Sequence, residues 1–301
     1  MTGQNRSTRL GLMDLALLAT VFIWGANFSV VKYALAELTP MTYNALRFGG
    51  ASLLTLLLAW LVERNLRIER SDWGYFLMLS LIGNLIYEVL FINGLALSRA
   101  GNTSLILSTA PIWVAVLGTA TGQERLSAVN WVGVFLSFGG LFVLTAASTA
   151  GLVMGRGALV GGLLVLASAF CWSVYTLLLK RMVHKYSSLV ATAWVMALTS
   201  PLLILAAAPD LRAQNWHAVS SRSWLGLLYS TVLAISIGYT VWSTGVKHVG
   251  SARTAVYSYL TPLISVSVAW ITLGETMHPW QAVGAAAIVV GVVLGRLKAG
   301  T

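Results

Sequence analysis

Apolar runs separated by short charged or turn-forming breaks follow one another along the whole chain. Several runs have roughly 18 to 22 residues, and an α-helix of that length crosses a hydrocarbon core of about 30 Å. We place the predicted helices between the breaks, five in each half of the chain. They cover residues 12–35, 41–62, 73–97, 103–120 and 129–147, then 157–180, 188–208, 223–246, 254–273 and 280–296. The pattern predicts an all-α polytopic membrane protein with ten transmembrane helices.

The composition agrees with this fold class. Hydrophobic residues make up 57% of the chain and charged residues 9%, whereas a soluble domain has about 25% charged residues. The net charge of +10 would favour a nucleic-acid partner in a soluble protein, but here the basic residues lie in short loops and form no basic face or RNA-binding motif. We therefore expect a lipid bilayer around the chain and no nucleic acid.

The basic residues of the loops predict the orientation. With a cytoplasmic N-terminus, thirteen of the nineteen lysines and arginines fall on the inner side and four in outer loops, while Lys32 and Arg47 lie inside helices. Cytoplasmic loops carry an excess of lysine and arginine in membrane proteins. The sequence therefore predicts a multi-pass protein with both termini in the cytoplasm.

The chain contains an internal repeat. An offset of 151 residues pairs Trp73 with Trp224, Gly94 with Gly245, Thr103 with Thr254, Pro111 with Pro262, Glu124 with Glu275, Gly133 with Gly284 and Gly140 with Gly291. Near an offset of 148, Trp24 is paired with Trp172 and Lys32 with Lys180. Matched tryptophan, proline and glutamate in one register are much rarer by chance than matched glycine, so we predict a duplicated unit with repeats at 1–150 and 151–301.

An odd number of helices in each repeat has a topological consequence. A unit of five helices leaves the second copy to enter the membrane from the opposite side, so the two repeats are predicted to be inverted. Inverted repeats are frequent in secondary transporters, where two similar halves exchange conformations and open a central site to each side in turn. A duplication kept for stability alone is the alternative.

Several motifs resemble a known family. They are Trp24-Gly25-Ala26-Asn27-Phe28, Pro111 and Gly122-Gln123-Glu124, with counterparts at Trp172-Ser173, Pro262 and Gly274-Glu275. The pattern resembles the EamA domain, two copies of which form the ten-helix members of the drug/metabolite transporter superfamily, and the chain is similar to the YddG-type exporters of aromatic amino acids. The resemblance implies a bacterial inner-membrane location. It also implies a central cavity between helices 1, 3, 4, 6, 8 and 9, with the other four helices more peripheral.

Aromatic side chains are the first candidates for the cavity wall. They lie deep in helices that the resemblance assigns to the cavity: Trp24, Phe28, Tyr87, Phe91, Trp172, Tyr175, Tyr239, Trp242 and Tyr257. Rings on one helical face, such as Tyr87 and Phe91 four residues apart, stack on a flat apolar solute with about 0.5 to 1.5 kcal/mol per contact. Packing against lipid or between helices is the alternative for each ring.

Polar side chains at membrane depth are the second group. Asn27, Asn84 and Ser108 need partners in protein or water at this depth, and a zwitterionic solute needs such donors and acceptors. Glu88 lies near the middle of the third helix, where an ionised carboxylate is expensive without a partner. Its candidate roles are binding a substrate ammonium or carrying a proton. The alternative is a buried pair with Arg47 or Lys32.

Two prolines and two glutamates are candidates for movement. Pro111 and Pro262 occupy equivalent positions inside predicted helices, where each removes a backbone hydrogen bond and opposes a straight helix, so we expect hinges there. Glu124 and Glu275 follow the fourth and ninth helices. They are expected to cap the next helix or anchor a loop, with a gate lock as the alternative.

No cofactor or metal is predicted, because no metal-ligand spacing joins the four histidines. Gly291 and Gly295 have the GxxxG spacing that allows close helix approach, and we expect it to serve packing within a monomer. The chain has no P-loop motif. We therefore predict a secondary transporter, not an enzyme, that exports small hydrophobic or aromatic amino acids and related metabolites by alternating access. The alternative is a membrane-embedded enzyme acting on a lipid substrate, which would need clustered Asp, His or Ser/His groups at one depth.

Overall fold

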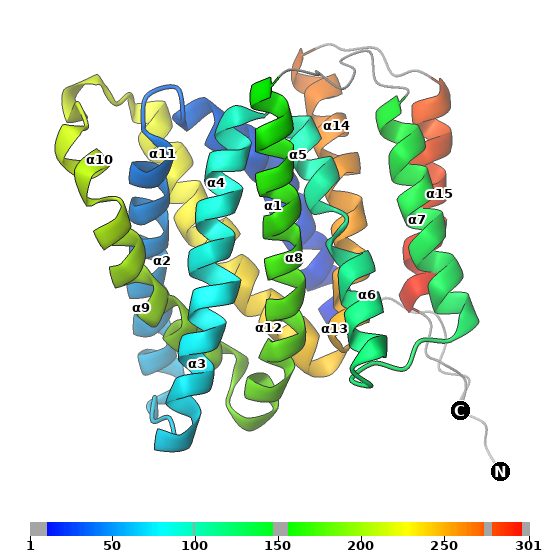
Figure 1. Cartoon of the computed structure of the whole chain (residues 1–301), viewed down its shortest axis with the longest axis horizontal. Helices are drawn as coiled ribbons and strands as arrows, with labels where there is room; N and C mark the ends of the chain where they lie inside the picture. Colours follow the sequence, from blue (N-terminus) through cyan, green and yellow to red (C-terminus); the bar gives the residue numbers. More distant parts are fainter. Residues whose placement is uncertain (1–10, 99, 147–155, 274–278, 297–301) are drawn as a thin grey trace.

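The computed structural model describes residues 11–98, 100–146, 156–273 and 279–296. Within these ranges the chain is helical between its loops and turns and has no strand. Helix occupies each of the ten predicted segments, which confirms the all-helical fold class. Figure 1 shows one bundle whose helices run between an upper end, with residues 35–39 and 207–220, and a lower end, with residues 64–72, 121–127 and 186–187.

The first half consists of five helical segments, two of which are interrupted. Its elements are α1 (Leu12–Ala34), α2 (Pro40–Glu63), η1 (Arg70–Asp72), α3 (Trp73–Ser80), η2 (Leu81–Ile86), α4 (Tyr87–Leu97), α5 (Ala100–Leu107), α6 (Ala110–Ala120) and α7 (Ala128–Ala146). The second half is built in the same order. Its elements are α8 (Arg156–Lys185), α9 (Ser188–Ala206), α10 (Ala208–Ala213), η3 (Trp216–Ala218), α11 (Ser221–Tyr229), η4 (Ser230–Ile237), α12 (Gly238–His248), α13 (Ser251–Val256), η5 (Tyr257–Tyr259), α14 (Leu260–Leu273) and α15 (Pro279–Arg296).

The outer surface of the bundle is apolar. Among the described residues, seven helical segments, some made of successive helices, are long and apolar enough to cross a membrane, and Ala128–Val143 and Ala282–Gly295 are shorter apolar helices. Large hydrophobic side chains such as Leu53, Phe142 and Leu205 are about seven-tenths exposed. Soluble proteins rarely expose apolar patches of this extent, so the surface suits a bilayer.

Local signals at the helix starts agree between the halves. The side chain of Thr39 caps α2 by accepting a hydrogen bond from the backbone N–H of Thr42 (3.3 Å), and Pro40 takes the first helical position, where a proline costs nothing. Ser187 caps α9 in the same way through the N–H of Val190 (3.1 Å). Thr39 and Ser187 are 148 residues apart. We call residues related by this offset, or by 151 from Glu69 onward in the first half, counterparts.

The third helix of each half contains a π-helical stretch, which the hydropathy pattern did not predict. The stretches are η2 and η4, and a shift of 151 residues carries 81–86 onto 232–237. π-Helical turns are rare and occur frequently at functional sites. Glu88 and its counterpart Tyr239 each lie two residues beyond the end of these stretches.

The fourth helix of each half is broken directly before its proline. α5 ends at Leu107 and α6 begins at Ala110, so that Pro111 lies in the first turn of a new helix. The 3₁₀ turn η5 precedes α14, which begins two residues before Pro262. The sequence predicted that each proline opposes a straight helix, and in the structure one helix ends before each proline, because the ring tolerates a first turn far better than a helix interior. Whether these breaks act as hinges stays a prediction.

α7 and α15 pack side by side and antiparallel at the edge of the bundle (Figure 1). Gly133 lies against Gly291 and Gly295, and Gly140 lies against Gly284. Because Gly133 and Gly284 are counterparts, as are Gly140 and Gly291, exchanging the two helices reproduces the same contacts. Between these sites Ser137 donates a hydrogen bond to the carbonyl of Ile288 (3.4 Å), its own counterpart.

Counterparts also meet at two places in the centre. The indole rings of Trp24 and Trp172 lie edge to face with centroids 5.8 Å apart, and the hydroxyl of Tyr239 donates to the carboxylate of Glu88 (2.8 Å). Each half therefore touches the other through equivalent positions, from the α7 and α15 contact to the middle of the bundle.

Equivalent loops contact each other at opposite ends. At the lower end Lys185 pairs with Glu69 (2.5 Å). At the upper end their counterparts meet, because the backbone N–H of Ser220 donates to Glu37 (2.8 Å). This hydrogen bond holds the pKa of the Glu37 carboxyl below its ordinary value, since it favours the charged form.

The close approach of α7 and α15 predicts unequal effects at two adjacent glycines. A Cβ on Gly140 would lie 2.7 Å from the Gly284 carbonyl oxygen, whereas a Cβ on Gly139 would meet nothing within 4 Å. We expect Gly140→Ala to lower the free energy of unfolding by about 1 to 3 kcal/mol through overpacking. Gly139→Ala should be neutral or raise it by up to about 1 kcal/mol, the gain in helix propensity. Unfolding in detergent, followed by circular dichroism, measures both; equal effects would contradict the packing.

Candidate functional site

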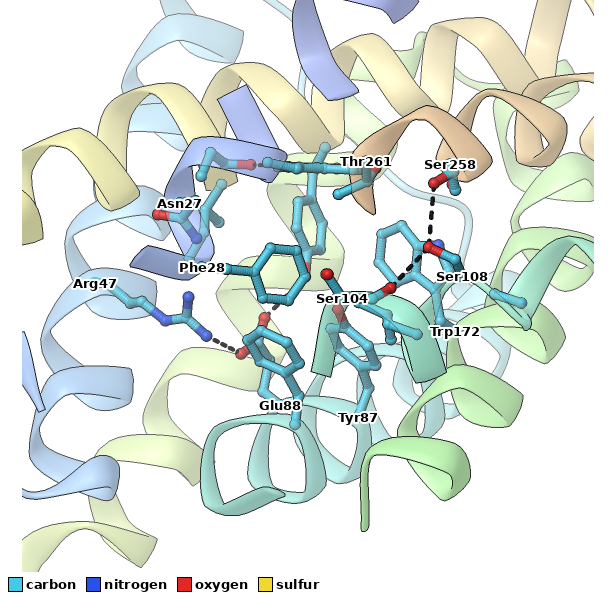
Figure 2. Close-up of a pocket in the computed structure, with 17 residues that line it drawn as sticks. Asn27, Phe28, Arg47, Tyr87, Glu88, Ser104, Ser108, Trp172, Ser258 and Thr261 are labelled. Atoms are coloured by element: carbon cyan, nitrogen blue, oxygen red, sulfur yellow. Dashed lines mark hydrogen bonds and ion pairs between the residues drawn. The ribbon is translucent and has the colours of Figure 1, made fainter. Parts of the chain in front are cut away.

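A cavity lies in the middle of the bundle, where both halves contribute its wall (Figure 2). Its wall comes from α1, α2, α4, α5 and α6 of the first half and from α8, η4, α12, η5 and α14 of the second. The lining residues are Trp24, Asn27, Phe28, Arg47, Tyr87, Glu88, Phe91, Ser104, Leu107, Ser108, Ala110, Trp172, Ala234, Ile235, Tyr239, Ser258 and Thr261.

The structure brings nine of the thirteen predicted cavity residues to this wall. They are Trp24, Asn27, Phe28, Tyr87, Glu88, Phe91, Ser108, Trp172 and Tyr239. The other four, Asn84, Tyr175, Trp242 and Tyr257, are buried but do not line the cavity.

Those four residues belong to the layer behind the wall. The ring of Tyr175 packs on Gly83, next to Asn84. Trp242 is held back from the cavity because its indole N–H donates to the hydroxyl of Thr176 (3.2 Å). The hydroxyl of Tyr257 donates to Asp14, near the lower end of α1. Helical spacing alone did not distinguish a cavity-facing ring from a ring that packs between helices.

Sequence reasoning missed eight lining residues. Seven are small or apolar side chains whose position carries no pattern of its own: Ser104, Leu107, Ala110, Ala234, Ile235, Ser258 and Thr261. The eighth, Arg47, entered the analysis only as a partner for Glu88. The rule that selected Glu88, a charge inside an apolar helix, applies equally to Arg47 and would have found it.

The rings leave little free space. The volume open to the centre of a water molecule is about 70 Å³, several times the roughly 10 to 15 Å³ that one water needs. The cavity in this conformation therefore has room for a few waters. A solute with an aromatic ring requires the wall to move.

Trp172 is the hub of the aromatic wall. Its ring centroid lies 5.1 Å from both Tyr87 and Tyr239, and 5.8 Å from Trp24. Aromatic pairs favour such tilted and edge-to-face arrangements. Trp24 is fixed in turn, because its indole N–H donates to the carbonyl of Ala234 in the π-helical stretch η4 (2.8 Å).

A buried ion pair forms the charged part of the wall. The Nη2 atom of Arg47 lies 2.5 Å from Oε2 of Glu88, and both side chains are 2% exposed. Tyr239 donates to the other carboxylate oxygen, and Nε of Arg47 donates to Asn44 (2.9 Å). The guanidinium also lies over the rings of Tyr43 and Phe91 (5.6 and 5.7 Å). Each charge thus has a partner, as burial at this depth requires.

Lys32 does not pair with Glu88. Its Nζ donates to the carbonyls of Leu95 and Ala96 (2.9 Å each) and of Ser98 (2.7 Å) at the upper end of α4. A cation at a helix C-terminus satisfies the last carbonyls and the helix dipole. Of the two partners considered from sequence for Glu88, the structure selects Arg47.

Hydrogen bonds between helices fix the polar part of the wall. Ser230 donates to the amide oxygen of Asn27 (2.5 Å). Ser108 lies between α5 and α6. It donates to the carbonyl of Ser104 (2.7 Å) and to that of Ser258 (3.3 Å), which lies in the 3₁₀ turn η5 before α14. Ser108 therefore connects the break between α5 and α6 with the turn η5 of the other half at the cavity (Figure 2).

Glu124 joins three elements at the lower end. Its carboxylate pairs with Lys180 of α8 (2.8 Å) and accepts the backbone N–H of Ser251, the first residue of α13 (3.1 Å). It therefore caps α13 of the other half, whereas the sequence placed its cap on the next helix, α7. Glu275, its counterpart, lies outside the described residues.

In the described part of the chain no three His, Cys, Asp or Glu side chains come together as metal ligands.

These observations define a polytopic helical membrane protein with a central cavity, lined in part by aromatic rings, between two similar halves. The chain belongs to the EamA-like transporter family, part of the drug/metabolite transporter superfamily, because the family model matches residues 11–146 and again 159–296. The two matches agree with the predicted duplication.

Individual relatives extend over almost the whole chain. An "Uncharacterized transporter" of Archaeoglobus fulgidus is 31% identical over 94% of this chain and 97% of its own. A "Probable amino-acid metabolite efflux pump" of Salmonella typhimurium is 30% identical over 93% of each chain. A solved crystal structure with 19% identity superposes with a TM-score of 0.77 and covers 95% of this chain and 96% of its own, which supports the fold.

The buried ion pair predicts a non-additive pattern of stability. Arg47→Met and Glu88→Leu each leave one buried charge without its partner, so each should lower the free energy of unfolding by about 3 to 5 kcal/mol. The double variant removes both charges and should cost less than either single one. Glu69→Gln, which breaks a pair whose carboxylate side chain is 63% exposed, serves as the control with at most about 1 kcal/mol. Thermal unfolding in detergent measures all four; additive losses would contradict the coupling.

Proposed function

We propose that the chain is a secondary transporter that exports small hydrophobic or aromatic amino acids and related metabolites by alternating access. Family membership supports transport. The observation that carries the substrate class is the cavity wall, which combines Trp24, Phe28, Tyr87 and Trp172 with one net-neutral charge pair. The efflux-pump name of the Salmonella relative agrees with an amino-acid metabolite as cargo.

The repeats 1–150 and 151–301 are proposed to be inverted, with ten spans in all. A residue touches its own counterpart only near the axis that exchanges two halves. Three counterpart contacts support one such axis: Trp24 with Trp172, Glu88 with Tyr239, and Ser137 with Ile288. The axis runs between antiparallel α7 and α15, so it is perpendicular to them and lies in the plane of the membrane.

The cavity lies on this axis, where alternating access requires the solute site. The breaks before Pro111 and Pro262 are the proposed hinges. The pairing of Glu124 with Lys180 and Ser251 is proposed to close the lower end in this conformation.

The lower end is proposed to face the cytoplasm of a bacterial inner membrane. It carries Arg64, Arg67, Arg125, Arg181 and Lys185, whereas Arg212 and Arg222 lie at the upper end, which agrees with the cytoplasmic excess of basic residues. We propose a monomer, because the GxxxG glycines of α15 are used against α7 within the chain.

Transport of paired substrates tests the role of the rings. In proteoliposomes, Trp172→Ala should lower the saturable flux of phenylalanine about tenfold more than that of leucine, because it removes ring contacts worth up to about 1.5 kcal/mol each. Trp224→Ala, whose ring is 43% exposed, is the matched control and should leave the ratio unchanged. Equal losses for both substrates would exclude ring stacking, and an absence of saturable flux in the wild type would exclude transport.

Loop labelling tests the inversion. Asn65 and Asn215 lie in equivalent loops, after the second helix of each half, and both are exposed. In a Cys171→Ser background, a membrane-impermeant maleimide should label Asn65→Cys from the cytoplasmic side and Asn215→Cys from the opposite side. Parallel repeats would expose both cysteines on one side.

A further inference from the structure

We infer that the Arg47–Glu88 pair is the recognition point for the zwitterionic head of an α-amino acid, whose carboxylate binds Arg47 and whose ammonium binds Glu88 when the pair opens. This inference rests on the proposed function and deepens it. In the empty cavity Arg47 and Glu88 neutralise each other. When the substrate binds, its carboxylate neutralises Arg47 and its ammonium neutralises Glu88.

Charge balance selects a zwitterion. Arg47 and Glu88 are the charged residues among those that line the cavity, so this wall is neutral as a whole. A solute with an ammonium alone would pair with Glu88 and leave Arg47 buried without a counter-charge. A solute with a carboxylate alone would leave Glu88 in that position. A buried charge without a counter-charge is strongly unfavourable. A zwitterion supplies a counter-charge to Arg47 and to Glu88 at once.

The two side chains are held independently of each other. Arg47 keeps its hydrogen bond to Asn44 and its contacts with Tyr43 and Phe91 when Glu88 moves away. Glu88 keeps the hydroxyl of Tyr239. One hydrogen bond connects the two charges directly, so the pair opens without dismantling the supports of either group.

The guanidinium has capacity for a carboxylate. Within the described part of the chain, Nε and Nη2 of Arg47 have hydrogen-bond acceptors and Nη1 has none. Nη1 and Nη2 together can bind a carboxylate in the bidentate geometry that arginine favours. Figure 2 shows the guanidinium directed at Glu88, with Phe28 and Tyr87 beside the pair, where the ring of an aromatic amino acid would lie.

Three ligands that share one ring separate the charges. Phenylalanine carries both charges at pH 7.5, 2-phenylethylamine the ammonium alone, and 3-phenylpropionate the carboxylate alone. Dissociation constants measured in detergent, by quenching of tryptophan fluorescence, avoid differences in passive permeation. We expect the wild type to bind phenylalanine at least about tenfold more tightly than either analogue, because each analogue leaves either Arg47 or Glu88 without a counter-charge.

Two variants should shift this preference in opposite directions. Glu88→Gln leaves Arg47 without its acid, so the affinity for 3-phenylpropionate relative to phenylalanine should rise at least about tenfold. Arg47→Gln should raise the relative affinity for 2-phenylethylamine by a similar factor. Glu69→Gln breaks an ion pair at the lower end and should leave all ratios at the wild-type value. Ratios within one variant cancel losses of folded protein.

The outcomes separate the inference from the function. Unchanged ratios in both cavity variants, with saturable phenylalanine flux in the wild type, would overturn the inference and leave the transporter standing. Equal weakening of all three ligands by Glu88→Gln, with loss of the pH dependence of flux, would make Glu88 a proton carrier and also overturn it. An absence of saturable binding and flux in the wild type would overturn both.

Discussion

The buried contact of Arg47 and Glu88 is the interaction on which the centre of the molecule depends. Neither charge is tolerable alone at membrane depth, so in this conformation electrostatics as well as packing holds α2 against α4. The hydroxyl of Tyr239 brings α12 of the other half into the same contact. Three helices from two repeats therefore converge on one pair of charges, and the cavity opens beside it.

The position of this contact explains where the two repeats differ. Where two counterparts contact each other, either two identical side chains must attract each other or the two halves must carry different residues at that position. Two tryptophans can meet, because the edge of one ring attracts the face of the other, as at Trp24 and Trp172. Two carboxylates at the same distance would repel each other. At the Glu88 position the second half therefore has a tyrosine, whose hydroxyl donates where a second acid could not.

The sequence predicted the helices, the duplication and the need for a partner to Glu88, because hydropathy, residue identity and the cost of a buried charge do not depend on the tertiary arrangement. It did not predict the π-helical stretches, which leave the hydropathy pattern unchanged. It also did not separate Tyr239, on the wall, from Trp242, three residues further along α12 and behind it. In helices that are apolar on most faces, hydropathy does not distinguish a side chain that faces a cavity from one that faces another helix.

The two ends of the bundle are unlike in this conformation, although the scaffold repeats. Lys180 at the lower end pairs with the carboxylate of Glu124, which also holds the start of α13. Its counterpart Lys32 at the upper end binds three backbone carbonyls at the end of α4. Under the proposed alternating access, a difference of this kind between the two ends is expected of one of the two conformations that the repeats exchange. Since the rings of Trp24 and Trp172 touch at the centre and the cavity has space for a few waters, the proposed admission of a solute with an aromatic ring requires the cavity wall to move.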